Sequence, residues 1–239
     1  MNSIIKDIRA ELKSNSDISI KNSSKRFFKE EVKAYGIKSS TVSVIAKKYW
    51  KIIQEEKLSK KQIFEICEEL LKSDYCEEAF IVSNWCPRLK ADFEEKDLKL
   101  FKVWIDKYIN NWAKCDSFCN HTIGDFITKF PQASTIKEIK SWGKSNNRWM
   151  KRASAVSFII PARKGEYLKD ALEIADTLLL TKDDMVQKGY GWLLKEASRK
   201  HEKEVFNYVI KNKQVMPRTA LRYAIELMPK DLKEKAMKK

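Results

Sequence analysis

Glycine and proline are scarce in this chain, with six and five copies among 239 residues. Both residues interrupt regular secondary structure, so their scarcity favours a fold built from regular elements. Long apolar runs are missing as well, and no window approaches the roughly 18 residues of a membrane span. Residues 1–15 have the pattern of an amphipathic helix rather than a signal peptide. We therefore expect a cytoplasmic protein, associated with the nucleoid in a prokaryote, that has no membrane partner.

Metal-binding and catalytic signatures are also few. The sequence contains only two histidines, His121 and His201, and it has no phosphate loop, dinucleotide fingerprint, nucleophile elbow or zinc-protease helix. Cys115 and Cys119 are four residues apart but lack a second pair of ligands, so we expect no metal and no cofactor. The odd number of cysteines in apolar contexts favours reduced core residues over disulfides. They are Cys67, Cys76, Cys86, Cys115 and Cys119.

Charge of one sign is abundant instead. The chain carries 48 lysines and arginines against 33 acidic residues, a formal net charge of +15. Such an excess favours polyanionic partners, because binding releases counterions, and nucleic acid is the leading candidate. The alternative is a lysine-rich surface that only solvates its helices.

Apolar residues recur at intervals of three and four along most of the chain, which is typical of amphipathic helices. The sequence therefore predicts an all-α protein. Short polar breaks separate the helices and contain side chains suited to cap free backbone amides. The candidate N-caps are Ser40, Asp74, Thr135, Asn147 and Asp184.

A local pattern of one polar residue followed by small and large apolar residues repeats at steps of 37, 37, 37, 36 and 34 residues. This period favours an α-solenoid of HEAT-like helix pairs, which we expect to form a single domain over residues 1–239 with a concave basic face. On that face Asp116 and Lys188 would lie in repeats on either side of Arg152. The pattern begins at Thr41, Glu78, Cys115, Arg152, Lys188 and Arg222.

Trp112 and Asp116 are four residues apart, so they share one helical face if the helix begins early enough, or flank its N-terminus if it begins at Cys115. Either arrangement places an indole beside a carboxylate. The alternative interpretation is a core tryptophan next to an aspartate that caps the helix.

Several short motifs, taken in order, resemble the AlkD-type DNA alkylation repair family, the HEAT-like alkylpurine DNA glycosylases. The resemblance covers most of the chain and is strongest between residues 112 and 192. The matching motifs are Phe27, Gly36-Ile37, Trp112-x-x-x-Asp116, Gly124-Asp125, Trp149-x-x-Arg152-Ala153 and Gln187-Lys188-x-x-Gly191-Trp192.

The resemblance implies an enzyme that hydrolyses the glycosidic bond of cationic N3- and N7-alkylpurines in double-stranded DNA. It implies a catalytic aspartate at Asp116, with Trp112 and Trp192 against the deoxyribose of the lesion and Arg152 near a phosphate. We take a monomer as the expected state. Further DNA contacts are expected from Phe27, Lys47, Lys48, Arg148, Lys151 and Lys188.

This chemistry agrees with the scarcity of histidine. A purine alkylated at N3 or N7 is already cationic and leaves without a proton from a general acid. A carboxylate such as Asp116 would stabilise the positive charge that grows on the sugar and orient a water molecule for attack.

The chain departs from the family pattern at a few positions. Asn111 stands where a tryptophan is common, Ala113 where an acidic residue is frequent, and Phe27 where tyrosine is usual. Ser43 falls where a basic residue is expected, although Lys47 and Lys48 follow one turn later. These differences concern the range of lesions and the rate more than the type of reaction.

Two other functions use the same fold. A noncatalytic helical-repeat protein could bind bent or branched DNA through the basic face, and it would not need Asp116. A protein-interaction scaffold would bind a peptide or a helix in its groove. Salt separates these functions, because DNA binding weakens steeply as salt rises and an apolar peptide groove changes little.

Overall fold

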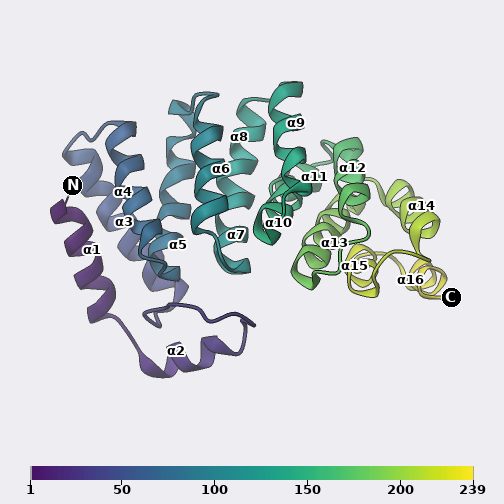
Figure 1. The fold of residues 1–239 in the computed structure, drawn as a ribbon, viewed down its shortest axis with the longest axis horizontal. Helices are drawn as coiled ribbons and strands as arrows, with labels where there is room; N and C mark the ends of the chain where they lie inside the picture. Colours follow the sequence, from purple (N-terminus) through teal and green to yellow (C-terminus); the bar gives the residue numbers. More distant parts are fainter. Residues whose placement is uncertain (1, 239) are drawn as a thin grey trace. The chain divides into compact units, whose positions relative to one another are not determined.

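The computed structural model describes residues 2–238, and within them it contains helices and no β-strand, so the all-α prediction is confirmed. The chain divides into two compact units, Met1–Phe118 and Cys119–Lys239. Figure 1 shows the helices of each unit in chain order. Within the described residues, no helix combines the length and the apolar character that crossing a membrane would take. The expected single domain over residues 1–239 stays a prediction.

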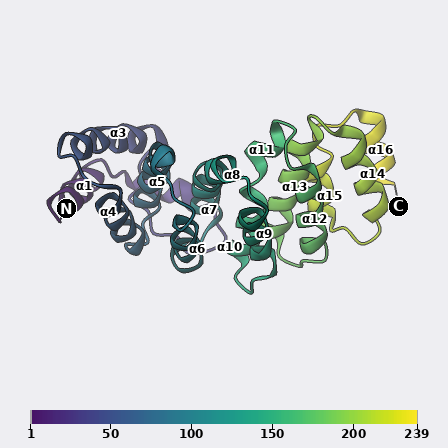
Figure 2. The ribbon, with the colours of Figure 1, turned by 90° about the horizontal axis from the view of Figure 1, so that it is seen from above.

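The first unit is built from two layers of helices. Helices α3, α5 and α7 pack in succession and form one layer. Helices α4 and α6 pack on each other in the second layer, and α4 also packs on α5 of the first (Figure 2). Helix α1 covers α3 and α4. The elements are α1 (Asn2–Ser14), α2 (Ile18–Lys25), α3 (Ser39–Glu55), α4 (Lys60–Lys72), α5 (Cys76–Trp85), the 3₁₀ helix η1 (Cys86–Asp92), α6 (Asp97–Tyr108) and α7 (Trp112–Phe118).

The second unit has the same organisation. Helices α10, α13 and α15 pack in succession, and α9, α12 and α14 pack behind them. The unit opens with a single π-helical turn, η2 (Cys119–Ile123). The other elements are α8 (Gly124–Lys129), α9 (Ala133–Ser141), the 3₁₀ helix η3 (Trp142–Lys144), α10 (Arg148–Val156), α11 (Ile159–Arg163), α12 (Leu168–Leu178), α13 (Asp184–Ser198), α14 (Glu202–Asn212), α15 (Arg218–Ala224) and α16 (Lys230–Met237).

The predicted repeat corresponds to real helices. Helices α3, α5, α7, α10, α13 and α15 begin at residues 39, 76, 112, 148, 184 and 218, which are steps of 37, 36, 36, 36 and 34. Each start of the sequence pattern falls inside one of these helices. The layered packing within each unit, with this period, confirms the HEAT-like α-solenoid class.

The predicted helix caps are partly correct. Asn147 caps α10 and accepts a hydrogen bond from the backbone N–H of Trp149. Helix α13 is capped by Asp183, one residue before the predicted Asp184. The remaining candidates have other positions: Ser40 and Thr135 lie inside helices, and Asp74 lies in the connection between α4 and α5.

Large aromatic side chains fill the core between the layers of each unit. In the first unit, the indole Nε1 of Trp85 donates a hydrogen bond to the carbonyl of Ala46 (2.8 Å), which ties α5 to α3. All five cysteines are buried, as predicted. The largest fully buried aromatic residues are Trp85, Phe101, Trp104, Phe118, Phe126, Trp142, Phe158 and Tyr190.

Gly191 allows a close approach between two helices of the second unit. A Cβ at this position would lie 2.7 Å from Cβ of Tyr223 and 2.8 Å from the backbone oxygen of Ala220, both on α15. Real Cβ atoms do not come so close, so α13 and α15 can pack at this distance only because residue 191 has no side chain.

We expect Gly191→Ala to lower the free energy of unfolding by about 1–3 kcal/mol, because the added methyl group forces α13 and α15 apart. Gly124→Ala is the matched control. Its Cβ would meet the Ser157 oxygen at 3.4 Å and the Cys119 oxygen at 3.9 Å, which are ordinary contacts, and alanine should stabilise that helix by about 0.5–1 kcal/mol. Urea unfolding measures both changes, and equal stability of the two variants would contradict the packing explanation.

Candidate active site

The residues of the predicted reaction centre lie at the start of α7. Trp112 is the first residue of the helix and Asp116 lies one turn later, so the two side chains share a helical face. Both are half-buried, and neither belongs to the fully buried core. The expectation that an indole and a carboxylate come together on one face is therefore correct.

A buried lysine ties the start of this helix to the connection between α4 and α5. The ammonium group of Lys114, only 1% exposed, contacts the backbone oxygen of Asp74 (2.8 Å), its carboxylate Oδ1 (2.7 Å) and Oδ1 of Asn110 (3.0 Å). All three of its N–H donors thus have acceptors. Partial burial acts to raise the pKa of Asp74, but the hydrogen bond and charge of Lys114 and the hydrogen bond from Asn110 lower it below its usual value.

Asn111, at a position where the family that the motifs resemble commonly has tryptophan, has a structural role. Its side-chain oxygen accepts a hydrogen bond from the backbone N–H of Lys114 (3.0 Å), and its amide donates to the thiol of Cys76 (3.4 Å). The first of these bonds satisfies a backbone donor that the first turn of α7 leaves without a helical partner. Sequence reasoning missed this role, although an asparagine three residues before Lys114 was a possible capping signal.

The indole of Trp112 is held by the segment that follows α2. Its Nε1 donates a hydrogen bond to the backbone oxygen of Phe27 (3.1 Å). Its ring stacks on Phe28, with centroids 5.5 Å apart and planes inclined by 24°. The side chain of Phe27 is itself 65% exposed, so it is available for an outside contact.

Gly36 and Glu77 close the base of this segment. Gly36 has a φ of +88°, and a Cβ there would lie 2.4 Å from the backbone oxygen of Asp17, whose N–H donates to the Gly36 carbonyl (3.0 Å). Glu77, at the start of α5, accepts hydrogen bonds from the consecutive backbone N–H groups of residues 35–37, at 3.0, 2.8 and 3.2 Å. The chain between Asp17 and Gly36 is therefore a closed loop attached to α5.

The two lysines of α3 that are predicted to contact DNA differ in their surroundings. Lys48 pairs with Glu11 of α1 at 2.7 Å. Lys47 is exposed and makes no ion pair with any residue from 2 to 238. Of the two, Lys47 has the cation that is better placed for an outside phosphate.

In the second unit, Trp192 lies on α13 and is half-buried. Its Nε1 donates to the carboxylate of Glu196 one turn later (3.3 Å), which also accepts hydrogen bonds from Arg163 (2.8 Å) and Arg199 (2.6 Å). Burial acts to raise the pKa of Glu196, but the hydrogen bonds from the two arginines, with that of Trp192, lower it. A charged and well-held carboxylate thus orients this indole.

Arg152, which the sequence predicts to bind phosphate, is more buried than such a contact requires. Only 5% exposed, it lies between α10 and α13 and donates from Nη1 to the backbone oxygen of Met185. Gly189 makes room for it, since a Cβ there would be 3.2 Å from Cγ of Arg152. A phosphate could reach only the small exposed part of this side chain, and the predicted contact stays a prediction.

The other basic residues of this unit that are predicted to contact DNA also lie on α10 and α13. Arg148 pairs with the cap residue Asp183 (Nε to Oδ2, 2.7 Å) and lies over the ring of Trp149. The ammonium Nζ of Lys188 lies 3.6 Å from Oδ2 of Asp184. Lys151 is half-buried and makes no ion pair within the described part of the chain. To bind Arg148 or Lys188, a phosphate would have to compete with the aspartates that already pair with these side chains. At Lys151 it would meet no such competition.

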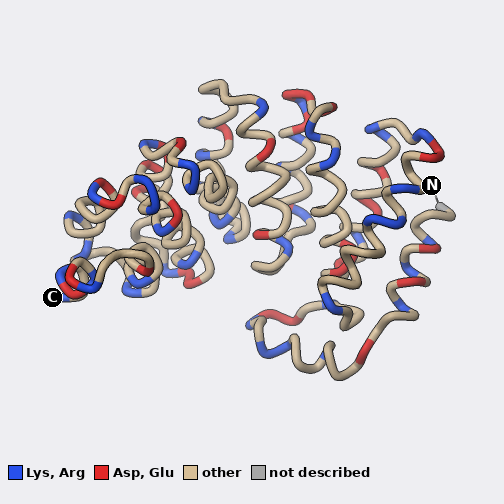
Figure 3. Tube along the Cα trace, turned by 180° about the vertical axis from the view of Figure 1, so that it is seen from behind, with Lys and Arg blue, Asp and Glu red and all other residues tan. Residues whose placement is uncertain are grey.

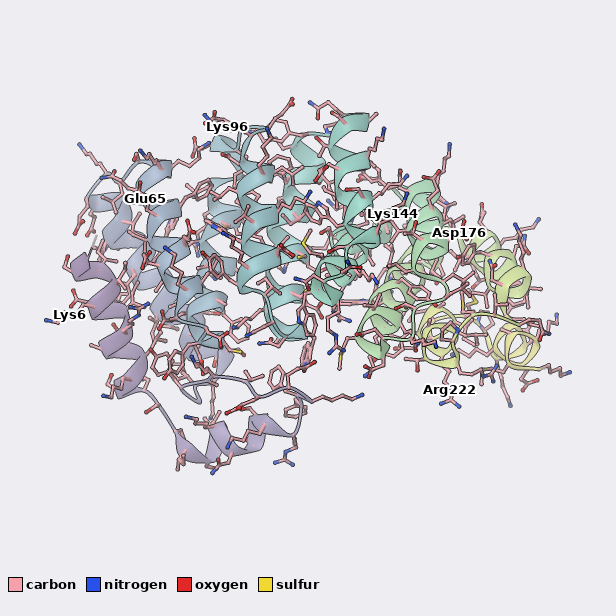
Figure 4. The ribbon with its side chains drawn as sticks, viewed as in Figure 1. Lys6, Glu65, Lys96, Lys144, Asp176 and Arg222 are labelled. Atoms are coloured by element: carbon pink, nitrogen blue, oxygen red, sulfur yellow. The ribbon has the colours of Figure 1, made fainter. Side chains whose placement is uncertain are left out.

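Basic and acidic residues are interspersed on the helices of both units (Figure 3). Lys6, Lys96 and Arg222, labelled in Figure 4, extend outward. A cavity of about 740 Å³ lined by α9 and α12 contains none of the predicted site residues. No group of three potential metal ligands occurs among the described residues. The predicted concave basic face stays a prediction.

Comparison with known proteins decides the family. The model of the family described as DNA alkylation repair enzyme matches residues 8–228. The chain belongs to this family. A predicted DNA alkylation repair enzyme from Enterococcus faecalis has a similar solved structure, with a TM-score of 0.78 and 14% identity over 90% of this chain and 98% of the other. No curated protein matches the sequence.

The resemblance seen in the sequence motifs is thus confirmed, and the chain has a role in the repair of alkylated DNA. The solved structure confirms the fold alone. In this DNA alkylation repair protein, the first unit places Trp112 on one helical face with Asp116 and bonds its indole to Phe27. The second unit packs α10, which carries Arg148 and Arg152, on α13, which carries Lys188 and Trp192.

Replacement of Asp74 by asparagine should reveal its ion pair with the buried Lys114. Because the folded state lowers the pKa of Asp74, its stabilising effect is complete above the unfolded-state value of about 4 and is lost as pH falls through the folded-state value. At pH 7 we expect Asp74→Asn to cost about 1.5–3 kcal/mol, near the lower end because Asp74 is partly exposed.

Urea unfolding at a series of pH values measures the effect. The difference between wild type and Asp74→Asn should be constant from pH 7 to about 4 and should shrink below that. Asp231→Asn, whose exposed carboxylate lies 3.9 Å from Lys235, is the control and should change little. A constant difference down to the lowest pH would contradict the ion-pair explanation.

Proposed function

We propose that this chain is a monofunctional DNA glycosylase that removes cationic N3- and N7-alkylpurines from duplex DNA. The observation that carries the proposal is the pair of Trp112 and Asp116 on one face of the first turn of α7. Family membership indicates that the damage is alkylation. The carboxylate and the indole are groups that can stabilise positive charge on the sugar. Duplex DNA is the proposed partner, and the proposed active form is a monomer.

The reaction needs few groups. The C1′–N9 bond breaks and the purine leaves with the bonding electron pair, which neutralises its positive charge. A water molecule forms the new C1′–O bond and releases its proton to the Asp116 carboxylate or to solvent. No general acid takes part, because the leaving group is already cationic. This agrees with a chain whose two histidines, His121 and His201, have no predicted role.

Asp116 is proposed to stabilise the positive charge that develops on the deoxyribose. Opposite unit charges about 4 Å apart attract each other by roughly 4 kcal/mol at the effective dielectric constant near a protein surface. That energy corresponds to about a thousandfold in rate if it is realised only in the transition state. The half-buried position of Asp116 limits screening by water without removing access to a substrate.

Both tryptophans are proposed to act through their ring faces. The Nε1 donor of Trp112 already bonds to the Phe27 carbonyl, and that of Trp192 bonds to Glu196. Neither indole therefore has an N–H left for a phosphate. A ring face attracts positive charge and packs on a sugar, a contribution of about 0.5–2 kcal/mol for each ring.

Lys114 is not available as a nucleophile, although it lies between the two site residues in sequence. Its ammonium is buried, and its three donors are directed at Asp74 and Asn110. A lysine held in this way cannot reach the sugar to form a Schiff base. This supports hydrolysis by water and a product in which the DNA strand is intact.

We expect the wild-type chain to release 7-methylguanine from methylated duplex DNA and to leave abasic sites in unbroken strands. Chromatography of the released bases measures the first product, and gel electrophoresis before and after alkaline treatment measures the second. Strand cleavage without alkali would contradict the hydrolytic mechanism. Tight DNA binding without release would place the protein in the noncatalytic DNA-binding class.

A further inference from the structure

The first observation concerns what holds Trp112. The half-buried indole lies at the start of α7, and its hydrogen-bond acceptor and stacking partner come from residues 27 and 28, more than 80 positions earlier in the chain. The carbonyl of Phe27 takes the indole N–H, and the ring of Phe28 covers one face. Together these contacts set the angle of the ring plane, because a stack and an in-plane hydrogen bond restrict different rotations.

The second observation is that residues 27 and 28 are themselves held in place. They follow α2, whose N-cap Asp17 accepts hydrogen bonds from Ser19 and Ile20. The loop that contains them is closed by the contact between Asp17 and Gly36 and attached to the buried Glu77. Figure 1 shows α2 and this segment beneath the lower ends of α3 and α5. The loop is therefore part of the first unit and not a free arm.

The third observation is that Phe28 both stacks on the ring of Trp112 and lines a cavity of about 410 Å³. The same cavity is lined by Lys21, Lys25 and Tyr75. Removal of the Phe28 ring would enlarge space that already exists, so the fold should tolerate its loss better than the loss of a core side chain. What would be lost is the support behind one face of the indole.

We propose that Phe28 is a positioning residue for the glycosylase reaction, which holds the Trp112 indole so that its opposite face meets the deoxyribose of the lesion. The proposal rests on the proposed function. Phe28 does not touch substrate in this assignment; it acts through Trp112. The loop of residues 17–36 thus contributes to the reaction through the stack as well as through the exposed ring of Phe27.

The test compares single-turnover release of 7-methylguanine with DNA affinity. We expect Phe28→Ala to slow release by about tenfold or more, because small misplacements of a group at the reacting centre are costly in rate. DNA affinity should change by less than about threefold. Phe28→Tyr keeps the stacking ring and should restore the rate, whereas Phe28→Leu keeps apolar bulk without a ring and should not.

Controls separate positioning from general damage. Phe206→Ala removes a half-buried phenylalanine of α14, in the second unit, and should leave the rate unchanged. In a Trp112→Ala background, which has no ring to stack, Phe28→Ala should have little further effect, because the two residues act as one unit. Equal slowing by Phe28→Ala in both backgrounds would overturn the proposal.

A spectroscopic measurement tests the contact without activity. In protein labelled with 5-fluorotryptophan, the ¹⁹F resonance missing from Trp112→Phe identifies Trp112. Phe28→Ala should shift or broaden this resonance, and Phe28→Tyr should restore it. An unchanged resonance would overturn the positioning role. Absence of release by wild type would instead count against the proposed function, and the Trp112 resonance would still decide whether Phe28 holds the ring.

Discussion

The buried ammonium of Lys114 is the charge on which the candidate active site depends. A buried cation without acceptors would be strongly destabilising, so the chain must bring Asp74 and Asn110 to it before the first unit can be stable. Those contacts hold the connection between α4 and α5 against the residues that precede α7. They thereby hold the start of α7, where the indole of Trp112 and Asp116 lie on the same face one turn apart.

A second constraint is common to the two candidate tryptophans. Each indole N–H is already bonded within the protein, that of Trp112 to a backbone carbonyl and that of Trp192 to a carboxylate. What remains for a ligand is the ring face, the part of an indole that attracts positive charge. Such a face suits a ligand that carries positive charge, and it suits a neutral hydrogen-bonding ligand less well.

The sequence predicted the fold because the signals are local. Helical periodicity and the step near 37 residues depend on neighbours along the chain, and the structure confirms both. The contacts that shape the site are not local. Asp74 was expected to cap a helix, but Lys114, 40 residues away, takes its carboxylate. The burial of Arg152 against Gly189, and the capture of residues 35–37 by Glu77, likewise require partners that no window of sequence contains.

The measurement that tests the central claim most directly is single-turnover release of 7-methylguanine by Asp116→Asn, with DNA affinity measured in parallel. Asparagine keeps the size of the side chain and removes its charge. If Asp116 stabilises the developing sugar cation, release should slow by about 100- to 1,000-fold, while DNA binds as tightly as to wild type. Release at the wild-type rate would contradict the assignment of the reaction centre to the start of α7.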